Sequence, residues 1–277
     1  MKTTVIQSDA PRPLVNYSEC VVAGPFVFAA GQIASDYKTG IPPEARTDPA
    51  FPYYGSDIKR QTDYILGNLS KTFEAAGASL DDVIKAQVFL RDLDEFFAFD
   101  EVWKTYFKTP PPRTTVGTTS LLVPGCKVEV DLIGLMPDSG MEKTLIRSDA
   151  PSPMANYSEG YRAGDFVFAA GQIASDYKTG IPPEARTDPA FPYYGSDIKR
   201  QTDYILGNLS RTFEPAGASL DHVVKAQVFM TDLNEFFAFD EVWKTYFKTP
   251  PPRTTVGTTG LLVPGCKVEI DLIGVAG

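Results

Sequence analysis

The chain has 277 residues, of which 43% are hydrophobic and 22% charged, with a formal net charge of −9 and one histidine. This acidity and the lack of a Lys/Arg cluster argue against a nucleic-acid partner, since phosphates repel an acidic surface. No stretch approaches the ~18 apolar residues of a membrane span, the first twenty residues lack the apolar run of a signal peptide, and three unpatterned cysteines suit a reducing compartment, so we expect a cytoplasmic protein.

The beginning of the chain predicts short strands and then a long loop. Thr4–Gln7 is prone to form a strand, and Tyr17–Val22 and Phe26–Ile33 are two strand-like runs around the turn Ala23-Gly24-Pro25, which favours a hairpin. The following segment, 34–55, is rich in proline and glycine. At about twenty residues it is longer than an ordinary connection, and loops of that length in compact domains are often functional.

The next segments predict two helices and three more strands. One helix begins at the N-cap Ser56, runs to Ala76 and stops at Gly77. Asp92 and Glu95 form a capping-box-like start for a second, aromatic-rich helix. In chain order, the predictions are a helix over 57–76, a strand over 83–90, a helix over 95–107 and strands over 113–119 and 127–133. This order predicts an α+β domain with two helices on one face of a sheet.

The same elements are predicted a second time, because the sequence repeats after 140 positions. Phe26–Ser70 recurs residue for residue as Phe166–Ser210, and Glu95–Thr119 recurs as Glu235–Thr259. We therefore predict two tandem domains, residues 1–137 and 138–277, joined by the short polar linker 136–141.

The duplication also works as a filter, since chemistry shared by both copies cannot depend on a residue found in one. His222 corresponds to an aspartate at the aligned position of the first copy, which argues against histidine-based catalysis and histidine metal sites. Cys20 corresponds to a glycine in the second copy, so only Cys126 and Cys266 are shared, one in each repeat. Neither belongs to a CxxC motif. Each of these is most simply a small buried residue.

Three polar residues in each repeat are candidates for chemistry. Arg113 follows three prolines at the start of a predicted strand, and there a guanidinium suits bidentate capture of a carboxylate, although a surface arginine at a strand end looks the same. Glu129 alternates with valines and could lie on a solvated strand face. Tyr17 could equally be an ordinary strand aromatic. Their counterparts in the second repeat are Arg253, Glu269 and Tyr157.

Several short segments together resemble the RidA (YjgF-like) family of imine and enamine deaminases. The segments are Asp9-Ala10-Pro11, Asn16-Tyr17, Ala30-Gly31-Gln32-Ile33, Ala75-Ala76-Gly77, Val88-Phe89-Leu90-Arg91-Asp92-Leu93, Pro112-Arg113 and Lys127-Val128-Glu129-Val130. The resemblance covers both repeats. It implies a chorismate-mutase-like α+β domain, trimeric rings with clefts between neighbours, and hydrolysis without a metal or organic cofactor.

The resemblance also assigns roles to residues. The arginine that grips the substrate carboxylate falls on Arg113 and Arg253, and the glutamate that orients the attacking water falls on Glu129 and Glu269. The pocket tyrosine falls on Tyr17 and Tyr157, and the backbone at Gly31 and Gly171 would line the same cleft.

Two positions depart from the family pattern and affect the expected substrate. Alanine stands where the family usually has serine, at Ala30 and Ala170, and threonine stands where it usually has cysteine, at Thr115 and Thr255. We expect the two threonines to contact substrate, and the changes put the usual small, 2-aminoacrylate-like substrate in doubt.

The run Pro-Arg-Thr-Thr-Val resembles the branch that deaminates 2-aminomuconate-type products of aromatic ring cleavage. Those substrates have two carboxylates, and Arg46 (Arg186 in the second repeat) or Lys38 on the long loop could hold the second one. The loop could instead be an insertion that stabilises a ring.

Two domains cannot close a ring of three, so three chains with six domains would form two rings, a homotrimer of pseudo-hexameric shape. The repeats differ at positions 20–22 and 25, close to Tyr17, so the clefts could be unequal. A non-catalytic protein that binds small acids is the alternative of another class. An endoribonuclease is disfavoured by the acidity and by the lack of a shared histidine.

Overall fold

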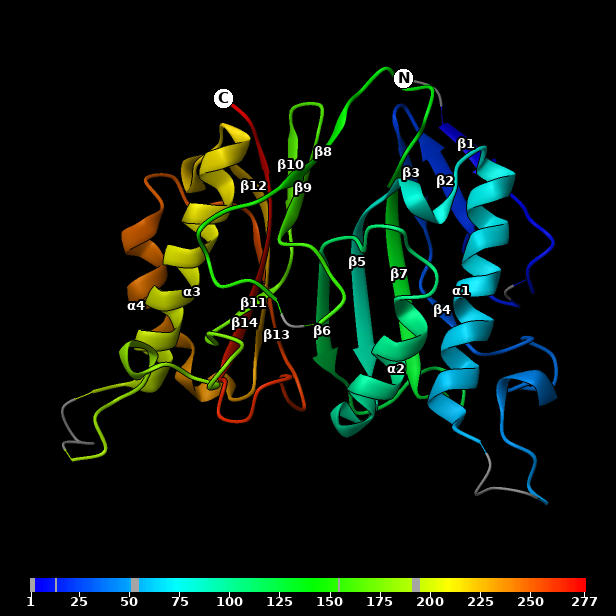
Figure 1. The fold of residues 1–277 in the computed structure, drawn as a ribbon, viewed down its shortest axis with the longest axis horizontal. Coiled ribbons are helices and arrows are strands. Elements are labelled where there is room, and N and C mark those ends of the chain that lie inside the picture. The colour runs from blue at the N-terminus through cyan, green and yellow to red at the C-terminus, as the bar shows by residue number, and fades with distance from the viewer. Residues whose placement is uncertain (1–2, 13, 51–54, 154, 191–194) are drawn as a thin grey trace. The chain divides into compact units, whose positions relative to one another are not determined.

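The computed structural model describes residues 3–12, 14–50, 55–153, 155–190 and 195–277 (Figure 1). Tyr53 and Tyr54 of the long loop lie outside this part of the chain. The chain divides into two compact units, of which the first comprises Met1–Pro111 and Thr118–Lys143. The second comprises Thr144–Gly277 together with the short segment Pro112–Gly117 from the first repeat.

The first unit contains an antiparallel sheet and two helices. Its strands follow the order β1-β2-β3-β7-β5, and β4 pairs with β7. The helices contact each other, and α1 also contacts β3, β4 and β7. The elements are β1 (Thr3–Ile6), β2 (Cys20–Ala23), β3 (Phe26–Ala29), β4 (Gln32–Ile33), α1 (Asp57–Ala76), β5 (Val83–Leu90), α2 (Phe96–Trp103) and β7 (Val128–Leu135).

The second unit repeats this arrangement. Its sheet has the order β13-β12-β14-β10-β9-β8, with β11 on β14, and the β12–β13 pair is parallel. Strand β6 (Arg113–Gly117) also belongs to this unit. The elements are β8 (Lys143–Ile146), β9 (Gly160–Ala163), β10 (Phe166–Ala169), β11 (Gln172–Ile173), α3 (Asp197–Phe213), β12 (Val223–Met230), α4 (Phe236–Tyr246), β13 (Arg253–Gly257) and β14 (Val268–Val275).

Alternation along the central strand of each sheet separates the core from the candidate site. In β14, Val268, Ile270 and Leu272 are buried in one apolar cluster with helix residues such as Leu209 and Trp243. Successive side chains of a strand point to opposite faces, so the acidic residues between these apolar ones lie on the face away from the helices. This is the predicted α+β domain, with its helices on one face of a mixed sheet.

The strand near Tyr17 is shorter than predicted, and the next predicted strand is broken in two. Strand β2 begins only at Cys20, and a gap at Ala30 and Gly31 separates β3 from β4. The backbone N–H of Ala30 donates to the Glu19 carbonyl at 2.9 Å, so the chain leaves its ladder with β7 at this point. Gly31 therefore stands at an irregular backbone position beside a regular strand.

The second helix also differs from the prediction. Helix α2 covers only Phe96–Trp103, since residues 104–106 form a turn instead of continuing it, and a 3₁₀ turn over Leu93–Glu95 precedes it. Asp92 caps that turn by accepting the Asp94 N–H at 3.0 Å. The Glu95 carboxylate does not complete the predicted capping box; it pairs with the Lys127 ammonium at 2.8 Å.

Helix α1 stops at the predicted glycine, since Gly77 takes the left-handed conformation with φ 83°. The corresponding helix α3 ends earlier, at Phe213, and a 3₁₀ turn over Glu214–Ala216 follows. Pro215 stands in this turn where the first repeat has Ala75, and proline cannot donate a helical hydrogen bond. Within the described ranges, no helix is both long and apolar enough to cross a membrane.

Candidate active site

A carboxylate lies on the face of each sheet that points away from the helices. Glu129 of β7 stands opposite Ile33 on one side and Phe89 on the other, and its equivalent Glu269 is 3% exposed. Burial, and next the neighbouring Asp131, raise the pKa of Glu129 above its ordinary value, and burial raises the pKa of Asp131 to about 6. Removing a carboxylate from water disfavours its charged form and so makes it a stronger base.

A glycine stands next to each of these carboxylates. A Cβ built on Gly31 would collide with the Glu129 Oε1 and lie 3.2 Å from its Cδ, and a Cβ on Gly171 would collide with the Glu269 Oε1. The backbone thus approaches the carboxylate as closely as a missing side chain permits. This places both predicted glycines at the predicted glutamates.

The second unit gathers predicted site residues from both repeats, because it includes strand β6. The Gly171 N–H donates to the Arg113 carbonyl at 3.3 Å, and the Thr115 N–H donates to the Glu269 Oε1 at 3.3 Å. The guanidinium carbon of Arg113 lies 5.5 Å from the centre of the Tyr157 ring. Arg113 itself is 2% exposed. Five predicted residues therefore form one cluster, which we call the Arg113 cluster: Arg113, Thr115, Tyr157, Gly171 and Glu269.

A second carboxylate lies beside the Arg113 cluster. The Thr114 hydroxyl donates to the Asp271 Oδ2 at 2.7 Å, and both side chains are buried. Asp271 occupies the position of Asp131 in the first repeat. Each site therefore has two carboxylates on one strand, two residues apart.

The remaining predicted residues are distributed differently. In the first unit, the Tyr17 hydroxyl donates to the Tyr37 hydroxyl at 3.3 Å, and Tyr17 is 40% exposed. Glu129 and Gly31 adjoin each other in the same unit. Arg253 of β13 does not meet Glu269 in the described contacts of its unit. It pairs instead with Asp240 of α4 at 2.9 Å.

Helix α4 surrounds the Arg253 side chain with aromatic rings. The guanidinium carbon lies 4.8 Å from the ring centre of Trp243 and 5.2 Å from those of Phe236 and Phe239. Together with the Asp240 ion pair, these rings fix the guanidinium plane by cation–π contact. Thr255, two residues further along β13, is half-buried and stands opposite Val228 in the parallel pair.

The loop arginines lie at the surface of their own units. Arg46 and Arg186 are exposed, each directly after a 3₁₀ turn, Pro43–Ala45 or Pro183–Ala185. Arg186 lines a pocket of about 300 Å³ that contains no member of the Arg113 cluster. Its lining residues are Pro183, Arg186, Thr187, Asp188, Pro189 and Arg200.

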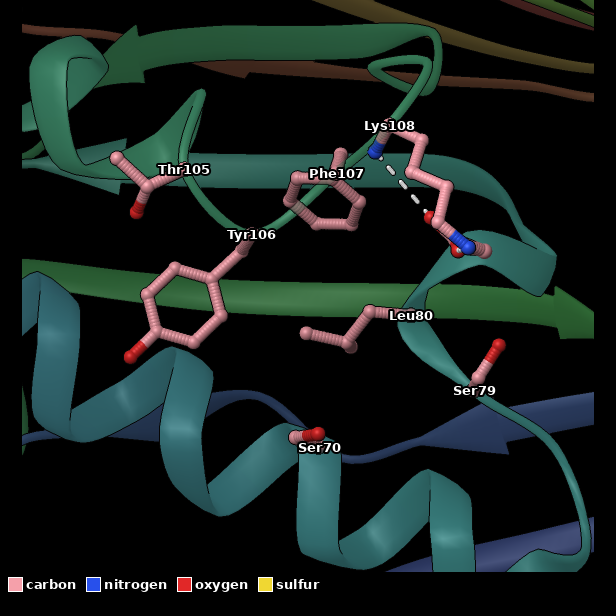
Figure 2. Close-up of a pocket in the computed structure, with 8 residues that line it drawn as sticks. Ser70, Ser79, Leu80, Thr105, Tyr106, Phe107 and Lys108 are labelled. Carbon is pink, nitrogen blue, oxygen red and sulfur yellow. Dashed lines mark hydrogen bonds and ion pairs between the residues drawn. The ribbon is translucent and has the colours of Figure 1, made fainter.

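A larger pocket of about 500 Å³ lies in the first unit beside α1 and the segment after α2 (Figure 2). Its polar groups are already engaged: the Lys108 ammonium pairs with Asp81 at 2.8 Å, and the Tyr106 hydroxyl donates to the Asp63 carboxylate at 2.7 Å. The pocket contains none of the predicted site residues. Size alone does not make it the candidate site.

Sequence reasoning missed one tyrosine in each repeat. Tyr37, and equivalently Tyr177, follows β4 or β11 and has φ 57°, a left-handed conformation that is rare for a bulky residue. Burial raises the pKa of Tyr37, as do Tyr17 and, more weakly, Glu129. The sequence offered only the motif Asp-Tyr-Lys-Thr-Gly, which is identical in both repeats like most of its surroundings.

Comparison with known proteins identifies the repeated domain. The family model described as Endoribonuclease L-PSP matches residues 7–136 and again residues 147–276. A RutC family protein of Pyrococcus horikoshii is 37% identical over 133 residues, which cover 48% of this chain and 97% of that protein.

Two further relatives match at similar levels. A 2-iminobutanoate/2-iminopropanoate deaminase of the mite Dermatophagoides farinae is 33% identical over 125 residues, 45% of this chain and 88% of that protein. The solved structure of RidA from a Psychrobacter species has 32% identity and a TM-score of 0.40, covering 48% of this chain and 98% of that one. Since the family model matches nearly the whole chain in two consecutive copies, this protein belongs to the Endoribonuclease L-PSP (RidA/YjgF) family as a tandem of two domains.

Proposed function

We propose that this chain is a cofactor-independent deaminase that hydrolyses the imine or enamine form of a carboxylic acid and releases ammonia. The observation that carries this proposal is the Arg113 cluster, in which a buried guanidinium and a buried carboxylate lie in one structural unit with a tyrosine and a close backbone approach. The imine deaminase name of the mite relative supports the same reaction class.

The reaction asks little of the protein. The enamine takes a proton on carbon and becomes an imine, water adds to the C=N carbon, and the carbinolamine loses ammonia to leave a carbonyl. Arg113 holds the substrate carboxylate, and Glu269 accepts the proton of the attacking water. Tyr157 and the backbone at Gly171 and Thr115 shape the site. Holding the water and the imine carbon in contact supplies much of the rate enhancement.

For the substrate, we propose a 2-aminomuconate-type acid formed in the degradation of aromatic compounds. Threonine at positions 115 and 255 and alanine at 30 and 170 support a pocket different from that of the small imino acids. A 2-aminoacrylate-type substrate is the second candidate, favoured by the name of the mite relative. Free, buried cysteines at 20, 126 and 266 fit a cytoplasmic protein.

The test is ammonia release from freshly generated 2-aminomuconate and 2-aminoacrylate. Arg113→Ala/Arg253→Ala should lose activity by at least 100-fold, whereas the exposed-site control Lys104→Ala/Lys244→Ala should retain it. Circular dichroism checks that both variants fold. A wild-type protein that binds a keto acid but releases no ammonia from either compound is a binding protein, and the proposal is then wrong. RNA cleavage in the same preparation would favour the endoribonuclease.

We further infer a homotrimer. The Arg113 cluster combines an arginine of the first repeat with a glutamate of the second. The remaining predicted residues are divided, because Arg253 belongs to the second unit, where it pairs with Asp240, and Glu129 and Tyr17 belong to the first. Another copy of the chain would bring Glu129 and Tyr17 to Arg253, and three copies would close two rings of three domains. Light scattering should give three times the 30.3 kDa chain mass. A monomer at micromolar concentration contradicts the inference.

A further inference from the structure

Tyr37 and Tyr177 are held in place by a turn that recurs in both repeats. Each has φ 57°, and its N–H donates to the preceding serine hydroxyl at 2.9 Å. The Asp36 carboxylate accepts the backbone N–H groups of Lys38 at 2.8 Å and Thr39 at 2.7 Å, and Asp176 does the same in the second repeat. A strained conformation that is fixed by so many bonds at a candidate site points to a function for the side chain it presents.

The hydroxyl of this tyrosine lies at the candidate site. In the first unit it is 3.3 Å from the Tyr17 hydroxyl. In the second unit the Tyr177 hydroxyl is buried and makes no hydrogen bond of ordinary geometry within the part of the chain that the structure describes. Burial first, and then the neighbouring Tyr157 and Glu269, raise its pKa well above the ordinary value. The phenol therefore stays protonated, and the acceptor nearest to it is another phenol, that of Tyr157.

A buried phenol that has only another phenol beside it lacks a strong acceptor, and a bound molecule can supply one. A carboxylate fits best, because hydrogen bonds to a charged acceptor are the strong ones. Arg113 supplies the other donor, since its guanidinium lies over the Tyr157 ring. Tyr177 and Arg113 are thus two separate donors beside Tyr157, and Glu269 accepts from the strand that carries Arg113.

We propose that Tyr177, and Tyr37 in the first repeat, bind the second acidic group of the substrate and make the site selective for unsaturated dicarboxylates. This inference rests on the proposed function, whose first carboxylate is bound by arginine. It gives the second carboxylate a different partner from the loop arginines, because the pocket that Arg186 lines contains no member of the Arg113 cluster.

The test compares two probes that share one carbon skeleton, hexa-2,4-dienedioate and hexa-2,4-dienoate, by calorimetric titration of the full chain. Wild type should bind the dienedioate at least 10-fold more tightly. Tyr37→Phe/Tyr177→Phe should lose that preference and keep its affinity for the dienoate. The matched control Tyr106→Phe/Tyr246→Phe removes two hydroxyls that bond to Asp63 and Asp203, and it should keep the preference.

Three results would overturn the inference: a wild type without preference, a tyrosine variant with the preference intact, or loss of the preference in Arg46→Ala/Arg186→Ala instead. Because binding is read without turnover, these results are separate from the ammonia assay. A protein that prefers the dienedioate and releases no ammonia would refute the deaminase and leave the tyrosine assignment standing.

Discussion

At the scale of single residues, Gly31 and Gly171 show how tightly the site is built. The added Cβ of either would overlap the carboxylate oxygen of Glu129 or Glu269, whereas the glycines inside the two long helices have room. Gly67 in α1, for example, has Tyr106 as its nearest neighbour at 3.8 Å, and Gly207 in α3 has Tyr246 at 4.0 Å.

We predict that Gly31→Ala/Gly171→Ala lowers ammonia release by about 100-fold, because displacing a catalytic group by ~1 Å costs that much. The crowding should also cost about 1–3 kcal/mol of stability. Gly67→Ala/Gly207→Ala is the control, and it should stabilise the helices by roughly 0.5–1 kcal/mol and leave turnover unchanged. Kinetics and urea unfolding measure both effects. Equal turnover in the two variants would contradict the idea that the close approach of the glycine backbone to the glutamate carboxylate matters for catalysis.

The pKa of Asp131 makes a second prediction at this scale. Its folded value of about 6 exceeds the ordinary 3.8, so the folded protein binds the proton more tightly than the unfolded chain. The contribution of Asp131 to stability is therefore greatest below its pKa in the unfolded chain, and it is lost as the pH rises through its pKa in the folded protein. Glu129, whose pKa is also raised, acts in the same direction.

Asp131→Asn should remove part of this dependence. Between pH 4 and pH 7 the free energy of unfolding should fall in both proteins. The fall should be smaller in the variant by roughly 2 kcal/mol, because asparagine has no proton to lose. Urea titrations at the two pH values provide the measurement. Parallel pH dependence in variant and wild type would show that Asp131 titrates normally.

At the scale of elements, the helices that pack on the sheet follow local signals. Gly77 ends α1 as predicted, and Pro215 moves the end of α3 back to Phe213. The aromatic helices depart from prediction for a non-local reason: Glu95 is drawn to Lys127, more than thirty positions away, instead of to its own helix start. A capping rule cannot anticipate a stronger partner elsewhere in the fold.

We predict that Ala75→Pro is tolerated in the first repeat. A proline inside a helix costs about 3 kcal/mol, but Pro215 shows that this turn can become 3₁₀ without further change. The expected loss in the free energy of unfolding is therefore ~1 kcal/mol, measured by urea unfolding. Pro215→Ala should raise the free energy of unfolding by about the same amount. A loss near 3 kcal/mol would mean that the two helix ends are not equivalent.

At the scale of the molecule, the pairing of site residues across the repeats is the central result. Arg113 of the first repeat contacts the ring of Tyr157, and the strand that carries it bonds to Glu269 through Thr115. The candidate sites therefore differ in composition: one combines Arg113 with Glu269, and the other would combine Arg253 with Glu129.

This pairing predicts the behaviour of double variants. Arg113→Ala/Glu269→Gln damages one kind of site twice and should retain about half of the wild-type activity, if the two kinds are equally active. Arg113→Ala/Glu129→Gln damages both kinds and should retain about 1% or less. Ammonia release per chain measures the difference. The opposite order of the two variants would show that each repeat uses its own arginine.

The sequence alone determined the repeat and the α+β order of elements, because these depend on local patterns and on identity between the two halves. Only the tertiary structure decided that the strand of Arg113 lies beside Glu269 and Tyr157 and that the Tyr37 hydroxyl lies beside that of Tyr17. Those facts depend on contacts between residues far apart in the chain and on a strained backbone angle, and neither leaves a periodic trace in a sequence.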